Sequence, residues 1–162
     1  SYGPRGIGAL FVRRGIISQP LLHGGGHENG RRAGTEAVAL ACGFAKALAL
    51  AEKIKTKEYA RVKKLCDNLA KKILKKIPDC TINGDLEYAL PNILNISIVG
   101  CDSEALVIYL DAAGIAVSGG SACKSSLGTG SYVISAIRQG RNEDTDTIRF
   151  SLGRDTKNED IL

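Results

Sequence analysis

The chain has 162 residues, of which 44% are hydrophobic and 24% are charged, and its formal net charge is +5. This composition is typical of a globular protein with a real core and excludes a disordered chain. The longest apolar stretch, residues 37–51, is interrupted by Lys46, so we expect no membrane-spanning segment. The five cysteines form no CxxC pair and no zinc-type cluster, which predicts reduced thiols, a cytoplasmic protein and no metal site.

The first third of the chain is predicted to contain a strand, a glycine-rich loop and a helix. Residues 7–12 are apolar and follow a Gly-Pro turn, which predicts a strand. Residues 13–33 are rich in glycine and predict irregular structure. Thr35 precedes an alanine-rich segment and is predicted to cap a helix that runs to about Lys55.

A second helix is predicted over residues 57–77, ending before Pro78. Its many lysines alternate with apolar residues at helical spacing. Such a run could bind nucleic acid or an acidic partner. The periodicity instead favours a solvated lysine face opposite a stripe that packs on the core, so we expect no nucleic-acid partner.

The remaining sequence alternates short strands with helices. Strands are predicted at residues 80–82, 93–99, 115–117 and 147–152, and helices at residues 103–113 and 131–138. Thr156 is expected to cap a final helix. The alternation predicts an α/β or α+β domain, in which helices pack on a small sheet.

Cys123 lies in a run of small and polar residues, Ser118 to Ser126. Most unpaired cysteines are buried and structural. Here two glycines and four serines predict a pliant, polar loop that exposes the thiol. The neighbouring Lys124 is expected to favour its nucleophilic thiolate form.

Five motifs together resemble the C-terminal half of a cysteine desulfurase of the long-loop group that serves iron-sulfur assembly. They are YGPRGIGAL at residues 2–10, HGGGHENGRRAGT at 23–35, PNILN at 91–95, SGGSAC at 118–123 and IRFSLGR at 148–154. Two positions depart from the family pattern. Gly119 replaces a usual serine, and Lys124 replaces a small hydroxyl residue.

The resemblance implies the C-terminal domain of a pyridoxal-phosphate-dependent transferase fold, together with the tail end of its large cofactor domain. Residues 1–35 would be the remnant of the large domain and residues 36–56 a connecting helix. Residues 57–162 would form the small α/β domain that carries the cysteine loop, truncated at its end. The family works as a homodimer.

The resemblance also implies roles for three residues. Cys123 would be the catalytic nucleophile that takes sulfur from L-cysteine as a persulfide and leaves L-alanine. Arg149 would bind the substrate α-carboxylate, and Thr35 would contact the phosphate of pyridoxal 5'-phosphate bound to the neighbouring subunit. The lysine that holds this cofactor would precede Ser1, so we expect the chain alone to be inactive. The sulfur would pass to an iron-sulfur scaffold or another acceptor protein.

Other interpretations stay open at this point. The chain could be a non-enzymatic persulfide carrier or scaffold, or a basic interaction module that uses its lysine-rich helix. The intact protein could act on selenocysteine. Thr35 could be only a helix cap and Arg149 an ordinary arginine, while His23 and His27 are interpreted as loop residues rather than ligands or catalysts.

Overall fold

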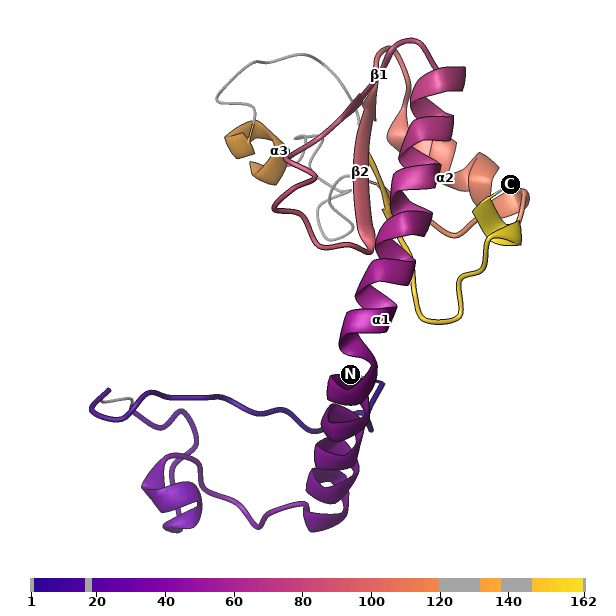
Figure 1. The fold of residues 1–162 in the computed structure, drawn as a ribbon. Helices are drawn as coiled ribbons and strands as arrows, with labels where there is room; N and C mark the ends of the chain where they lie inside the picture. Colours follow the sequence, from indigo (N-terminus) through magenta and orange to yellow (C-terminus); the bar gives the residue numbers. More distant parts are fainter. Residues whose placement is uncertain (1, 17–18, 120–131, 138–146, 162) are drawn as a thin grey trace. The chain divides into compact units, whose positions relative to one another are not determined.

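The computed structural model describes residues 2–16, 19–119, 132–137 and 147–161 (Figure 1). The chain divides into two compact units, Ser1–Lys55 and Thr56–Leu162. Each unit is described by itself below. Helix α1 (Val38–Lys76) contributes its first part to one unit and its second part to the other.

The first unit contains the 3-10 helix η1 (His27–Gly30) and the beginning of α1. The strand predicted at residues 7–12 is wrong: these residues are irregular and pair with none of the described strands. Leu10 and Phe11 are 85% and 89% exposed. Near them, the chain approaches α1 closely, since a Cβ added to Gly43 would lie 3.2 Å from the Pro4 ring.

Helix α1 corrects two predictions. It is one continuous helix of 39 residues, where two helices were expected. Its middle contains no glycine or proline, and i,i+3 ion pairs support it there, Lys55–Glu52 and Arg61–Glu58, both at 2.6 Å. The helix begins at Val38, three residues beyond Thr35, so Thr35 is not its cap.

The second unit is built on a four-stranded sheet in the order β1-β2-β4-β3. The strands are β1 (Cys80–Ile82), β2 (Ile93–Ile98), β3 (Ser118–Gly119) and β4 (Thr147–Ser151), and every pairing is antiparallel. The predicted strands are confirmed except the one at 115–117, which forms at Ser118–Gly119 instead.

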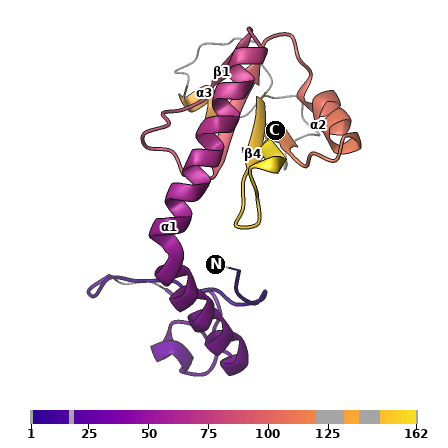
Figure 2. The same ribbon diagram turned by 45° about the vertical axis from the view of Figure 1, so that its right-hand side comes forward.

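The shorter helices agree with the sequence pattern in part. Helix α2 (Ser103–Ala112) is capped by Asp102, whose carboxylate accepts hydrogen bonds from the amides of Glu104 and Ala105. Helix α3 (Tyr132–Ile137) lies on the opposite side of the sheet from α1 (Figures 1 and 2). The last element is a 3-10 helix, η2 (Glu159–Ile161), and Thr156 does not cap it. The Thr156 hydroxyl instead accepts from the Gly153 amide at 2.9 Å.

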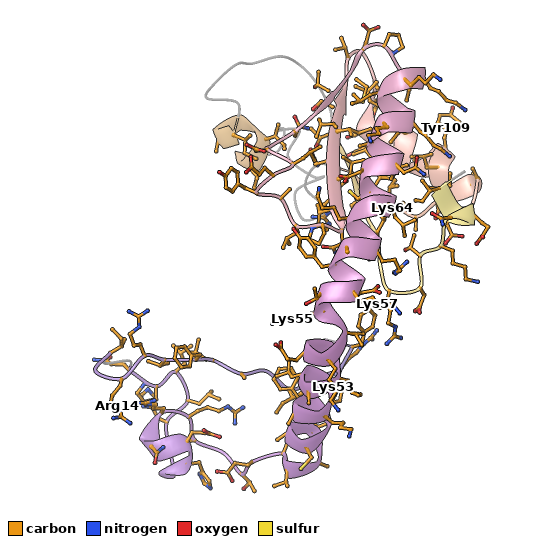
Figure 3. The ribbon with its side chains drawn as sticks, in the orientation of Figure 1. Arg14, Lys53, Lys55, Lys57, Lys64 and Tyr109 are labelled. Carbon is orange, nitrogen blue, oxygen red and sulfur yellow. The ribbon has the colours of Figure 1, made fainter. Side chains whose placement is uncertain are left out.

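The core of the second unit lies between α1 and one face of the sheet. The buried residues of α1 pack with those of the strands and of the C-terminal segment: Val62, Leu65, Cys66, Ala70, Cys80, Leu94, Ile96, Ile148, Leu152 and Ile161. Burial raises the pKa of the Cys66 and Cys80 thiols. The lysines Lys57, Lys64, Lys71 and Lys75 are exposed, so the predicted solvated face is confirmed. Figure 3 labels Lys57 and Lys64 on this helix.

Candidate functional site

The strand register sorts the side chains of the sheet onto two faces, because directly paired residues project to the same side. One face is apolar and pairs Ile82 with Ile96, Ile96 with Ile148 and Leu94 with Phe150. This face covers the core. The other face is polar over most of its length and carries the candidate site.

The polar face holds a row that crosses β2, β4 and β3 and reaches the residue after β1. Asn95 of β2 is paired with Arg149 of β4, and Arg149 with Ser118 of β3. Asn83, directly after β1, extends the row because its amide donates to the Asn95 carbonyl oxygen at 2.9 Å. We name these four residues, Asn83, Asn95, Arg149 and Ser118, the polar row.

A side-chain network fixes the β1 end of the row. The Asn83 Nδ2 donates to Asn95 Oδ1 at 2.6 Å and to Ser97 Oγ at 2.8 Å. Ser97 is 1% exposed, and its cross-strand partner Thr147 is 4% exposed. The Thr147 hydroxyl finds no hydrogen-bond partner within the described part of the chain. The polar face is therefore partly shielded from solvent beside an exposed arginine.

Arg149 is exposed, and its guanidinium makes no hydrogen bond or ion pair with any other described residue. The backbone is held on both sides, because β4 pairs with β2 and with β3. An arginine whose backbone is held, and whose five N–H donors bond to none of the described residues, suits a carboxylate, which it can bind in a bidentate manner. The geometry is thus compatible with the role that the sequence predicts for Arg149.

Cys123 lies outside the described residues, as do all residues from 120 to 131. The structure describes the strand that leads to it. Ser118 and Gly119 form β3, and Ser118 is the cross-strand partner of Arg149. A Cβ added at Gly119 would meet Ser103 Oγ at 3.7 Å. The predicted nucleophile therefore lies four residues along the sequence from the end of the strand that flanks the predicted substrate arginine.

Thr35 lies in the first unit, exposed and non-helical, between η1 and α1. The first amides of a helix lack intrahelical partners and carry partial positive charge. The Thr35 hydroxyl and the N-terminal end of α1 suit an anion such as the phosphate of pyridoxal 5'-phosphate. Thr35 and the start of α1 are near each other in the chain, as such a phosphate site would require, and the role of Thr35 stays a prediction.

The two histidines lie in the segment that precedes α1, and their interpretation as residues without a catalytic or ligand role stays a prediction. His27 begins η1, and its ring lies against the backbone of Gly25, where an added Cβ would be 3.0 Å from the ring. Within the described ranges, no three histidine, cysteine, aspartate or glutamate side chains gather as a metal ion would require. None of the described helices is long and apolar enough to cross a membrane.

Asn83 and Asn95 were not identified as site residues from the sequence. Asn95 closes the PNILN motif, but the motif alone assigns it no function. A signal was present, because Asn95 and Ser97 alternate with the buried Leu94 and Ile96. That pattern places two polar residues on the second face of the strand.

Comparisons with known proteins identify relatives of the chain. The chain is 42% identical over 160 residues to a cysteine desulfurase IscS of Dictyoglomus turgidum, covering 99% of this chain and 41% of that protein. It is 43% identical over 162 residues to the cysteine desulfurase IscS of Salmonella typhi, covering 99% and 39%. The chain thus spans about 40% of the length of these curated relatives.

Solved structures give the same result. A NifS-like protein superposes with a TM-score of 0.81 at 30% identity, over 98% of this chain and 40% of that chain. A NifS-like protein from Rickettsia africae superposes with a TM-score of 0.72 at 34% identity, over 90% and 38%. The family profile of the class-V aminotransferases matches residues 1–162. The chain therefore belongs to the aminotransferase class-V family.

Proposed function

We propose that the protein to which this chain belongs is a cysteine desulfurase. It would remove the sulfur of L-cysteine, leave L-alanine, and carry the sulfur as a persulfide on Cys123. The observation that supports this most strongly is the 42% identity, across 99% of the chain, to a relative of that name. Because the chain spans about 40% of such relatives, the activity is proposed for the whole protein.

Arg149 is the proposed substrate-binding residue. Its guanidinium would take the α-carboxylate of L-cysteine and so fix the orientation of the amino acid. The antiparallel pairing on both sides of β4 would hold the Arg149 backbone in place while the substrate binds. The bidentate contact would also select α-amino acids over simple thiols, since a ligand without the carboxylate leaves the guanidinium unpaired.

Cys123 is the proposed nucleophile. Its thiolate would attack the substrate sulfur, an S–S bond would form, and the carbon–sulfur bond of the substrate would break. The electron pair of that bond stays with the carbon skeleton, which takes up a proton and leaves as L-alanine. Pyridoxal 5'-phosphate supplies the electron sink for this chemistry when it is bound. Thr35 would bind its phosphate in the neighbouring subunit of a homodimer.

The persulfide would then pass to an acceptor protein, an iron-sulfur scaffold or another sulfur acceptor, in the cytoplasm. The names of the relatives support the desulfurase activity, and the choice of L-cysteine over selenocysteine follows the same names. We propose no nucleic-acid or membrane partner. The exposed lysines of α1 lie on a solvated helix face.

The test uses the full-length protein with its cofactor and measures alanine and sulfide released from L-cysteine under reducing conditions. We expect Cys123→Ser to lower the rate by at least about a hundredfold, because the covalent step is lost. Cys101→Ser is the matched control: Cys101 is partly exposed, and it should keep the wild-type rate within about twofold. Equal rates in wild type and Cys123→Ser would overturn the proposal.

A further inference from the structure

Asn83, at the β1 end of the polar row, holds the side chain of its neighbour Asn95 in place. Asn83 uses its Nδ2 to hold two acceptors on β2, Asn95 Oδ1 at 2.6 Å and Ser97 Oγ at 2.8 Å. Its backbone amide adds a third bond to β2, to the Asn95 carbonyl oxygen at 2.9 Å. Asn83 is thus fixed against β2, and it fixes in turn which way the Asn95 amide group faces.

The direction follows from the strand order. β1 and β4 lie on opposite sides of β2, and the side-chain oxygen of Asn95, Oδ1, accepts from Asn83 on the β1 side. In a planar amide the oxygen and the nitrogen lie on opposite sides of the Cβ–Cγ axis. The Asn95 Nδ2 is therefore turned toward β4, where Arg149 is the paired residue.

Paired residues on one face of an antiparallel sheet have Cβ atoms about 4.5–5.5 Å apart. The Asn95 and Arg149 side chains therefore leave the sheet at paired positions on the same face, and neither Asn95 Nδ2 nor the Arg149 guanidinium has an acceptor to offer the other. Two adjacent donors on a partly shielded face need an acceptor from outside the pair. An oxyanion such as a carboxylate can take both, with one oxygen on the guanidinium and a further lone pair on the amide.

We propose that Asn95 donates a second hydrogen bond to the α-carboxylate of the substrate amino acid held by Arg149, and that Asn83 is the positioning residue that orients it. This inference rests on the proposed function. The carboxylate subsite would then be formed by two strands. Arg149 of β4 supplies the positive charge, and Asn95 of β2 supplies a neutral hydrogen-bond donor. The Asn95 amide carries no charge. It would restrict the orientation in which the substrate carboxylate binds, without strengthening the binding of other anions.

The test measures KM and kcat for L-cysteine in the full-length enzyme, and competitive inhibition by L-alanine and by ethylamine. Ethylamine is alanine without its carboxylate. Asn95→Asp keeps the acceptor for Asn83 but replaces the donor by an anion, so KM and the alanine inhibition constant should rise about thirtyfold. Asn95→Ala and Asn83→Ala should raise both about threefold to fivefold. The kcat of each variant should stay within about threefold of wild type.

Two controls separate this role from a structural one. Ser97→Ala removes an Asn83 acceptor that is not paired with Arg149, and it should leave both constants within about twofold. Ethylamine inhibition should be unchanged in Asn95→Asp, whereas a disturbed fold would weaken both inhibitors alike. Alanine binding by Asn95→Asp equal to that of wild type, with Arg149→Lys weakened, would overturn this inference alone. A wild-type enzyme that releases no alanine from L-cysteine would overturn the proposed function as well.

Discussion

Arg61 ties helix α1 to the turn that follows β4. Its guanidinium donates to the Glu58 carboxylate from Nε at 3.0 Å and from Nη2 at 2.6 Å. It also donates to three backbone carbonyl oxygens, those of Gly153 at 3.1 Å, Arg154 at 2.8 Å and Thr156 at 2.6 Å. One side chain thus holds three of the four carbonyl groups in residues 153–156.

The cost of Arg61→Ala can be worked out from these contacts. A hydrogen bond to a charged group contributes about 1.5–3 kcal/mol when it is well shielded. The Arg61 side chain is 35% exposed and that of Glu58 is 28% exposed, so water replaces part of each bond and the ion pair itself adds at most about 1 kcal/mol. We expect the turn to open more easily by about 2–3 kcal/mol.

Amide hydrogen exchange in the full-length protein reads this turn directly. The Gly153 amide is bound to Thr156 Oγ1, and the Leu152 amide to the Asn92 carbonyl oxygen. A loss of about 2–3 kcal/mol should speed exchange in residues 152–156 by about thirtyfold to 150-fold. Lys64→Ala removes an exposed cation from the same helix and should change nothing. Exchange in Arg61→Ala within about threefold of wild type would refute the reasoning.

Three further predictions follow from the second unit. Leu94 is fully buried, so Leu94→Ala should lower the free energy of unfolding by about 3 kcal/mol in urea titrations. Leu90 is 68% exposed, so Leu90→Ala should change the free energy of unfolding by less than about 0.5 kcal/mol. Equal effects of the two substitutions would contradict the assigned core. Burial raises the pKa of the Cys66 and Cys80 thiols, so iodoacetamide should alkylate both at least about tenfold more slowly than the exposed Cys42. Mass spectrometry of the native protein would measure these rates, and equal rates at the three cysteines would refute the burial of Cys66 and Cys80. The hydrogen bond from Arg61 lowers the pKa of Glu58. The contribution of the Glu58 carboxylate to stability is therefore full above the ordinary carboxyl pKa, and it is lost as pH falls through the lowered value. Glu58→Gln should flatten that part of an acid titration of thermal stability, and an unchanged slope would contradict the prediction.

The secondary structure of the second unit could be predicted because its signals are local. β2 alternates buried apolar with polar residues, and Asp102 begins α2 with its own cap. The strand expected at residues 7–12 failed because an apolar run specifies a strand only when a partner supplies the ladder. The break expected near residue 56 failed because neither glycine nor proline stands there, and helix propensity continues across it.

The candidate site was predicted only where a motif carried it. Arg149 and Thr35 came from the resemblance, and both stay proposals with an exposed side chain in a suitable place. Asn95 and Asn83 could not be found in this way, since their function depends on which residues face each other across strands. That pairing follows from the strand order β1-β2-β4-β3, in which β4 lies between β2 and β3 although residues 99–146 separate β2 from β4 along the chain. Local sequence does not encode this register.

The central claim is that Cys123 accepts sulfur from L-cysteine. Mass spectrometry of the full-length protein, incubated with L-cysteine and alkylated without reductant, tests it most directly. The account predicts an added mass of one sulfur atom on the peptide that contains Cys123, with none on the Cys66 or Cys80 peptides, whose thiols are buried. It also predicts one L-alanine released for each persulfide in the first turnover. Alanine release with the extra sulfur on another cysteine, or with none on Cys123, would contradict it.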